Sequence, residues 1–176
     1  MAIHQTIGFL FLLAITPLTI SIQYNYHASS SSPLLTSTCK KTEYQDLCLQ
    51  VLSSDPHSAT ADLTALGRIS TEKAEENSKS ILDYSFKAVN EAKDYPHWSY
   101  ISVCYHLYND SYYPLAEKGP LAFKRGDYKV VEGLVDQMRK SGSKCLSVPT
   151  ELKEMNDRSN FLVKITTVTI NILNLL

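Results

Sequence analysis

The residues of this 176-residue chain with the clearest chemistry are four cysteines, Cys39, Cys48, Cys104 and Cys145. An even number of cysteines behind an export signal is typical of disulfide-bonded domains, and four cysteines allow three pairings. Four buried thiols in a cytosolic protein are the alternative, against which the N-terminal segment argues. The sequence contains no Cys-x-x-Cys and no histidine at zinc-finger spacing from a cysteine pair. The cysteines therefore predict two disulfides and no metal site.

Three histidines beyond the N-terminal segment, His57, His97 and His106, are the remaining candidates for acid–base chemistry. None of them has a nucleophile or an orienting carboxylate at a recognisable spacing. The chain also lacks a Gly-x-Ser-x-Gly elbow, a P-loop, a dinucleotide-binding fingerprint and a His-Glu-x-x-His motif. We therefore expect no catalytic residues and no cofactor, and we interpret the histidines as surface or hydrogen-bonded core residues.

The N-terminus predicts export from the cell. Residues 1–39 contain no Asp, Glu, Lys or Arg, and the apolar run Ile7–Ile15 has the length of a signal-peptide core. A membrane span needs about 20 apolar residues, and Pro17 with the polar residues after it interrupts the run too early. We expect a signal peptide over residues 1–28, with an uncertain cleavage point, a secreted product, and no membrane attachment after cleavage.

The rest of the chain reads as a short leader and one domain. A polar, Ser-rich stretch predicts a flexible leader over residues 29–37, followed by a single folded domain over 38–176. The 17 basic and 18 acidic residues give a net charge of −1. Such a balance provides no basic field for nucleic acid, so nucleic-acid binding is not expected.

Hydrophobic periodicity predicts helices throughout the domain. The pair Asp55-Pro56 indicates a turn, after which one long helix is expected over about residues 60–93, capped by Thr60 or Asp62. The mixed charges over residues 72–79 are most simply a solvent-exposed face of this helix.

A second helix is expected from about Trp98, and Pro114 and Gly119-Pro120 leave its continuation open. Arg125-Gly126-Asp127 marks a helix boundary, and the spacing of apolar residues over 131–138 predicts the next helix.

The last segment, Phe161–Leu176, has three interpretations, of which a cleaved lipid-anchor signal fits poorly because of Lys164 and the asparagines. Its β-branched residues favour a strand, whereas its apolar residues also lie on one helical face. Because the other long elements are helical, we predict a helix.

Several stretches resemble one protein family. The run TCKKTEYQDLCLQVLSSDPHSATADLTALG, residues 38–67, resembles the opening of the plant invertase and pectin methylesterase inhibitors, with a two-cysteine hairpin and a Ser-Asp-Pro turn before a long helix. Cys104 with the following HLYND resembles the third cysteine of the family, and Cys145 stands where the fourth belongs. The sequence from Leu146 onward resembles the closing helix. The resemblance covers residues 38–176 and is nearest to a branch that includes pollen allergens described as invertase inhibitors.

This resemblance implies an all-α fold, a four-helix up-down bundle with an N-terminal helical hairpin and two disulfides. The implied pairs are Cys39–Cys48 and Cys104–Cys145, worth about 3 and about 4 kcal/mol by loop entropy. The implied function is inhibition of a plant cell-wall enzyme, pectin methylesterase or acid invertase, by a secreted monomer that blocks the enzyme's cleft in a one-to-one complex. A non-inhibitory helical carrier or storage-like protein is the alternative, and a carrier would need an apolar cavity in the bundle.

The sequence departs from the family where the two targets differ. Invertase inhibitors reach into their enzyme with Pro-Lys-Phe in a Gly-Asp-Pro-Lys-Phe run, and Gly126-Asp127-Tyr128-Lys129-Val130 stands at that position here. Asp127, Tyr128, Lys129 and Val130 are the candidate contacts, although Asp127 also fits a helix cap and Lys129 a solvated lysine. Since the missing Phe is an apolar anchor that interfaces commonly need, and pectin methylesterase inhibitors do not need the motif, we favour pectin methylesterase.

One modification site is predicted. Asn109-Asp110-Ser111 is the only Asn-x-Ser/Thr sequon with a permitted middle residue, so Asn109 is a candidate for N-glycosylation in a secreted protein.

Overall fold

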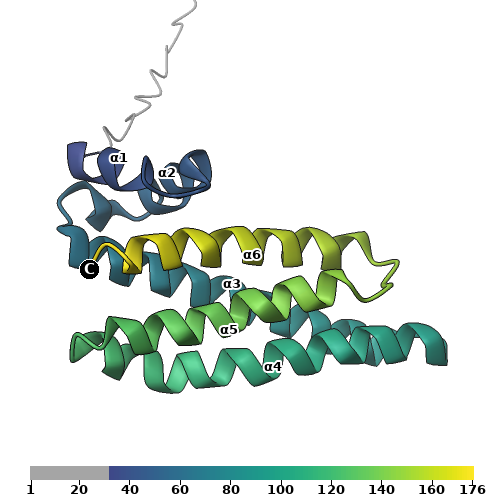
Figure 1. Ribbon diagram of the computed structural model, residues 1–176. Helices are drawn as coiled ribbons and strands as arrows, with labels where there is room; N and C mark the ends of the chain where they lie inside the picture. The colour runs from purple at the N-terminus through teal and green to yellow at the C-terminus, as the bar shows by residue number, and fades with distance from the viewer. Residues whose placement is uncertain (1–31) are drawn as a thin grey trace, which may run out of the picture.

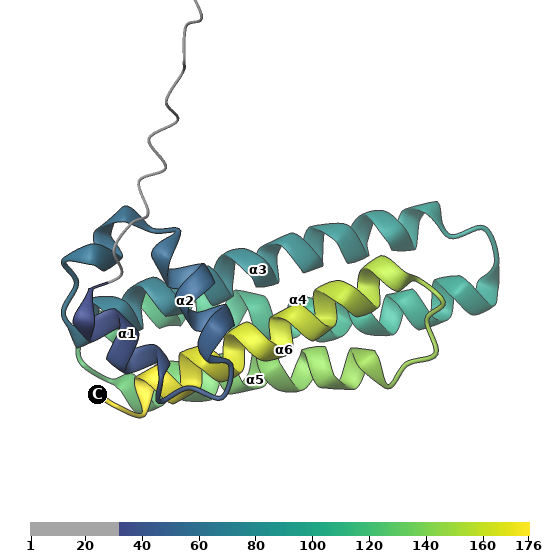
Figure 2. The same ribbon diagram turned by 90° about the horizontal axis from the view of Figure 1, so that it is seen from above.

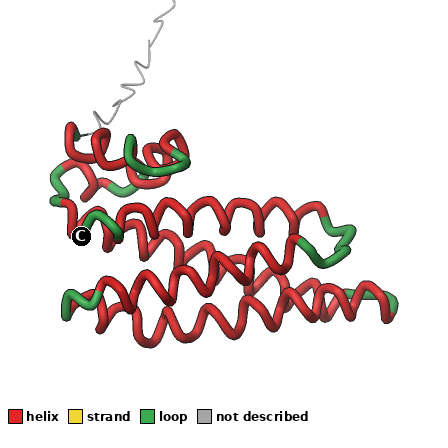
Figure 3. Tube along the Cα trace, viewed as in Figure 1, coloured by secondary structure: helices red, strands yellow, loops and turns green. Residues whose placement is uncertain are grey.

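The structure, a computed structural model, describes residues 32–176, so the predicted signal peptide lies outside the described residues. Every regular element of this part is helical (Figures 1 and 3). A hairpin of α1 (Pro33–Cys39) and α2 (Gln45–Ser53) leads through the 3-10 turn η1 (Pro56–Ala59) into four long helices. These are α3 (Leu63–Glu91), α4 (Tyr95–Lys124), α5 (Tyr128–Leu146) and α6 (Lys153–Leu173). The predicted fold class is confirmed.

The four long helices form an up-down bundle. Each packs against its neighbours in the sequence, and α6 closes the ring against α3 (Figure 2). The α1–α2 hairpin packs on α3 and α6 at one end of the bundle. The α4–α5 turn and the C-terminus lie at this same end, whereas the α3–α4 and α5–α6 loops lie at the other (Figure 1).

The first helix begins inside the segment predicted to be a flexible leader. Pro33 stands in the first turn of α1, where its missing amide is not needed, and the Ser32 hydroxyl accepts a hydrogen bond from the Leu35 amide at 3.1 Å. Leu35 is buried in the small core beneath the hairpin. The leader prediction is therefore wrong for residues 33–37, because a proline start and a buried leucine stabilise a helical turn there.

Aspartates cap two of the long helices. The Asp62 carboxylate accepts a hydrogen bond from the Ala65 amide at 2.7 Å at the start of α3, as one of the two predicted caps. Asp94 does the same for the His97 amide at 3.0 Å at the start of α4. Each carboxylate satisfies an amide that has no partner within its helix.

Helix α4 continues through both of its prolines. A proline inside a helix removes the hydrogen bond to the carbonyl four residues earlier. For Pro114 that carbonyl belongs to Asp110, and it accepts a hydrogen bond from Gln137 Nε2 of α5 at 3.3 Å. The buried residues of α4 recur along its whole length, so packing against α3 and α5 supports the helix past these positions.

Helix α6 accommodates its threonines through side-chain hydrogen bonds to its own backbone. The hydroxyls of Thr166, Thr167 and Thr169 donate to the carbonyls four residues earlier, at 2.6, 2.8 and 2.9 Å. Thr169 also lies 2.8 Å from the Ser70 hydroxyl of α3. Threonine side chains are thereby satisfied inside a buried helix face, and the helix prediction for this segment is confirmed.

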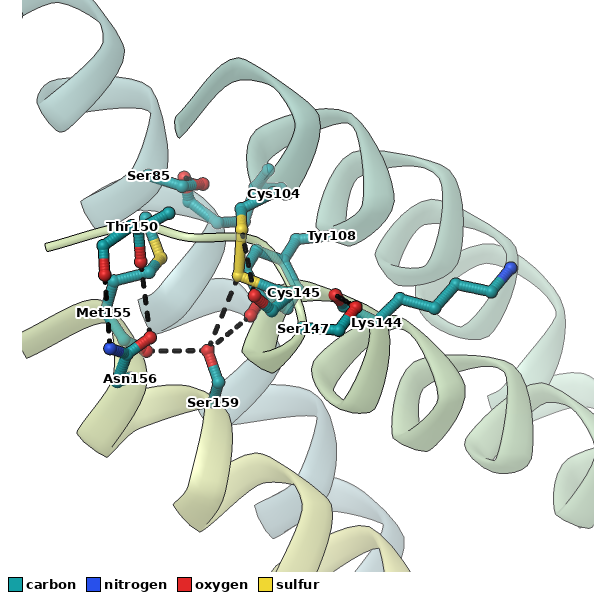
Figure 4. Close-up of a disulfide and its surroundings, with 11 residues drawn as sticks. Ser85, Cys104, Tyr108, Lys144, Cys145, Ser147, Thr150, Met155, Asn156 and Ser159 are labelled. Atoms are coloured by element: carbon teal, nitrogen blue, oxygen red, sulfur yellow. Dashed lines mark hydrogen bonds between the residues drawn. A yellow bond between two sulfur atoms is a disulfide. The ribbon is translucent and has the colours of Figure 1, made fainter. Parts of the chain in front are cut away.

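Two disulfides join the elements in the pairing that the resemblance implied. Cys39 is bonded to Cys48 within the hairpin, and Cys104 of α4 is bonded to Cys145 of α5. The second bond lies beside a buried polar cluster (Figure 4). There the Tyr108 hydroxyl is 2.6 Å from Ser159 Oγ, which in turn donates to the Met155 carbonyl at 2.6 Å.

Candidate functional site

The α4–α5 turn carries the candidate contact residues. Gly126 ends α4 with a φ of 76°, a conformation that favours glycine. Its amide donates to the Phe123 carbonyl at 3.0 Å, and the Asp127 amide donates to the Ala122 carbonyl at 2.9 Å. This pair of bonds is a Schellman motif, which fixes the direction in which α5 begins. The turn is therefore a rigid connection at the hairpin end of the bundle.

Asp127 precedes the first residue of α5, but its side chain makes no capping hydrogen bond. Its carboxylate accepts a hydrogen bond from Arg125 Nε at 2.9 Å, across the turn. Asp127 thus occupies the cap position that the sequence indicated, but it does not cap α5 with its side chain. The guanidinium competes for the carboxylate, and hydrogen bonds to charged groups are stronger than those to a neutral amide.

Tyr128 and Val130 stand where the invertase motif has Pro and Phe. The Tyr128 ring packs edge-on against the Phe123 ring, with centroids 5.1 Å apart, and is half-buried. Val130 is 50% exposed. Val130 is thus the apolar side chain of this run that remains open to a partner.

Lys129 projects from the first turn of α5 and bonds within its own protein. Its ammonium group donates to Glu132 Oε2 at 2.6 Å and to Asn174 Oδ1, just beyond α6, at 2.9 Å. The side chain is nevertheless 82% exposed. Ion pairs at such exposure are weak, so these contacts hold the lysine without preventing its release.

Asn109, the predicted glycan site, lies apart from this turn in the middle of α4. Its side chain is half-buried, with Nδ2 3.5 Å from Asp110 Oδ1, and Ser111 of the sequon is buried. Fifteen residues of helix at 1.5 Å each place it about 22 Å from the end of α4.

His97 is the best-connected histidine. Its Nδ1 lies 2.7 Å from Asp94 Oδ2, and its Nε2 lies 3.7 Å from Glu151, in the loop before α6. Hydrogen bonding to Asp94, with its negative charge, raises the pKa of His97. The pKa of Asp94 is lowered first by the hydrogen bond from the His97 amide and then by the hydrogen bond from the His97 ring. These residues link the loops at the far end of the bundle.

Surface grooves run between α3 and α4. One, of about 470 Å³, lies at the loop end beside His97, a second, of about 270 Å³, lies toward the C-terminal half of α4, and a third, of about 460 Å³, is lined by acidic residues of α3 and by Tyr112 of α4. All three open to solvent, unlike the enclosed chamber that a carrier would need. Within residues 32–176, no His, Cys, Asp and Glu side chains form a group that could hold a metal ion, and no helix has the length and apolarity to cross a membrane.

The fold and the turn define a class of protein: a small disulfide-bonded four-helix bundle with a helical hairpin packed on the end that carries the α4–α5 turn. The chain belongs to the plant invertase/pectin methylesterase inhibitor family, whose model matches residues 33–172. The branch within this family stays a prediction.

The relatives include inhibitors of both named targets. A pectinesterase inhibitor from Actinidia deliciosa is 39% identical over 61 residues, which are 35% of this chain and 33% of that protein. Cell wall / vacuolar inhibitor of fructosidase 2 from Arabidopsis thaliana is 38% identical over 76 residues, 43% of this chain and 42% of that protein. The matched regions thus span about a third and about two fifths of these curated relatives.

Solved structures share the fold. The crystal structure of mutant form A of a pectin methylesterase inhibitor from Arabidopsis has a TM-score of 0.70 at 18% identity, over 81% of this chain and 96% of that chain. A second, of a pectin methylesterase inhibitor from Arabidopsis thaliana, has a TM-score of 0.61 at 18% identity, over 81% and 95%.

The sequence placed residues 127–130 at one turn, but it did not reveal the hydrogen-bond partners of their side chains. Asn174, the partner of Lys129, is distant in sequence, and no motif marks it. The position of Glu132 one turn after Lys129 is a signal that could have found the ion pair.

Proposed function

We propose that the protein is a secreted inhibitor of plant pectin methylesterase that forms a one-to-one complex and blocks the active-site cleft with a helix surface. Family membership supports an inhibitor, and the two curated relatives name pectinesterase and fructosidase as the possible targets. The observation that carries the choice is that residues 127–130 offer no large apolar anchor, since the exposed apolar side chain there is Val130.

Invertase recognition through this turn would require Lys129 to leave Glu132 and Asn174. Breaking an exposed ion pair costs little free energy, so the missing apolar anchor is the stronger argument against invertase. Phe would bury a large ring, whereas Val130 offers a small side chain and Tyr128 already packs on Phe123. A pectin methylesterase inhibitor loses nothing by these replacements, because that activity does not need the motif.

Acid invertase is the second candidate. It is favoured by the longer match to the fructosidase inhibitor and by the exposure of Lys129, whose side chain is 82% accessible. In a carboxylate-lined cleft such a lysine could form an ion pair.

The test is a titration of purified protein into pectin methylesterase and acid invertase assays, with wild type, Lys129→Ala and Lys153→Ala. Lys153 is a matched control, because it is exposed and paired with Asp157 one turn on, at the other end of the bundle. We expect pectin methylesterase inhibition that is the same in all three proteins, and weak or absent invertase inhibition.

Other outcomes contradict the proposal. Invertase inhibition that falls by about 30-fold or more in Lys129→Ala alone would identify invertase as the target, because truncating a desolvated charge contact typically costs about 2–5 kcal/mol. Absence of inhibition of both enzymes would leave the carrier or storage-like alternative.

We further infer secretion to the cell wall and the absence of catalytic activity. The uncharged apolar N-terminus supports secretion, as does the relative named for the cell wall or vacuole. A fluorescent fusion with and without residues 1–28 tests it, since only the longer fusion should leave the cell.

A further inference from the structure

The groove toward the C-terminal half of α4 has an apolar wall, which includes no residue of the 126–130 turn. Leu115, Gly119, Pro120 and Phe123 of α4 face Thr71 of α3 across it. Its volume, about 270 Å³, is below the range of about 300–1,000 Å³ that is usual for sites enclosing drug-sized ligands. This part of the surface therefore has room for one large apolar side chain.

An acidic groove continues this apolar wall along α3. It is lined by Glu72, Glu75, Glu76 and Lys79, with Tyr112 of α4 on the opposite side. Glu72 and Glu75 line both grooves. The two form one continuous surface, here named the α3–α4 groove, with an apolar half and an anionic half.

Glu75, at the junction of the two halves, has no counter-ion among residues 32–176. The neighbouring charges are paired: Arg68 with Glu72, Lys73 with Glu76, and Lys79 with Asp83. Within residues 32–176 no hydrogen bond or ion pair reaches the Glu75 carboxylate. Partial burial, followed by the charges of Glu72 and Glu76, raises the pKa of Glu75. The ionised carboxylate is thus held among like charges, where a cation would be favourable.

We propose that the α3–α4 groove binds a segment of a partner protein that presents a Lys or Arg side chain beside a large apolar side chain. The basic group pairs with the Glu75 carboxylate and lies against the Tyr112 ring, since carboxylates and aromatic faces both attract such cations. The apolar side chain is buried against Pro120 and Phe123, where it displaces water from an apolar wall.

The groove beside His97 differs from the α3–α4 groove in the pairing of its charges. Its charged lining residues are largely paired within the protein, as Lys87 with Glu91 and Asp94 with His97. This groove therefore contains no unpaired carboxylate comparable to that of Glu75. No residue of the 126–130 turn lines the α3–α4 groove, so the proposal holds whichever enzyme the turn contacts.

The test uses isotope-labelled full-length mature protein and nuclear magnetic resonance titration with acetyl-Leu-Arg-Leu-Arg-amide as the probe. Acetyl-Leu-Glu-Leu-Glu-amide and acetyl-Ser-Arg-Ser-Arg-amide are matched peptides that lack the basic or the apolar component. The protein variants are Glu75→Gln and, as a control of the same residue type on the same helix, Glu91→Gln.

We expect saturable shifts of Thr71, Glu75, Leu115 and Phe123 with the first peptide, and far weaker binding of the other two. Glu75→Gln should weaken binding by about tenfold, and Glu91→Gln by less than about twofold. Glu75→Gln should melt at or above the wild-type temperature, because it removes an unpaired charge, so lost binding would not reflect lost fold. Shifts spread over the surface, equal affinity of Glu75→Gln and Glu91→Gln, or no saturation below about 5 mM would overturn the proposal.

Discussion

Replacing Tyr108 by Phe should destabilise the bundle near neutral pH. Tyr108 is 1% exposed, and its hydroxyl lies 2.6 Å from Ser159 Oγ beside the Cys104–Cys145 bond (Figure 4). Loss of a buried hydrogen bond typically costs about 0.5–1.5 kcal/mol, and an unsatisfied partner adds to this. Ser159 keeps the Met155 carbonyl as an acceptor, so we expect a loss of about 1.5 kcal/mol in the free energy of unfolding.

The difference in stability between wild type and Tyr108→Phe should nearly vanish in alkali. Burial raises the pKa of Tyr108 from its ordinary 10.0 to about 12. A raised pKa means that the folded state favours the protonated phenol. Its contribution is therefore complete below the unfolded pKa and is lost as the pH rises toward the folded one. By about pH 11 wild type should have lost about 1.4 kcal/mol from this group, whereas Phe has no proton to lose.

Urea denaturation at about pH 8 and about pH 11, followed by circular dichroism, measures both effects, since the midpoint and slope give the free energy of unfolding. The difference between wild type and Tyr108→Phe should shrink from about 1.5 kcal/mol to nearly zero. Tyr95→Phe is the control, because Tyr95 is 76% exposed, and it should match wild type at both pH values. A difference that is the same at both pH values would refute the reasoning.

Three further predictions follow from the turn, the far loops and the sequon. Tyr128→Pro combined with Val130→Phe rebuilds the Pro-Lys-Phe run and should confer acid invertase inhibition. Proline fits the first position of α5, because the only hydrogen bond lost there is the one from the residue 128 amide to the Gly126 carbonyl. Asp94→Asn keeps a capping oxygen but removes the pair with His97. The raised pKa of His97 gives stability below about pH 6.5 that is lost as the pH rises, and the lowered pKa of Asp94 gives stability above about pH 4 that is lost as it falls. Its melting temperature should therefore drop more at about pH 5 than at about pH 8, and an equal drop would contradict this. Asn109 should carry a glycan, and an unchanged mass of the secreted protein after glycosidase treatment would exclude it.

The fold could be read from the sequence where local pattern and family resemblance agreed. Phe161–Leu176 was ambiguous because the strand preference of its threonines does not register hydrogen bonds to the helix backbone, which Thr166 and Thr169 make. The course of α4 past Pro114 was likewise beyond a local reading, since the replacement donor is Gln137 on another helix.

The candidate site was less accessible to sequence reasoning. Residues 127–130 could be located, because a glycine boundary precedes them. The mixed charges over residues 72–79 were read as a solvent-exposed face, which is correct for most of them. Glu75 is an exception because Tyr112 of α4 lines the same groove. It lacks a counter-ion because Lys79, one turn further along α3, pairs with Asp83.

The up-down course of the chain also decides how the molecule can be handled as a reagent. The C-terminus, the hairpin and the α4–α5 turn share one end of the bundle (Figure 1). On a sensor surface, a C-terminal tag would therefore face the turn toward the support. A dye or linker in the loop over residues 147–152, at the opposite end, would leave the hairpin end free in solution.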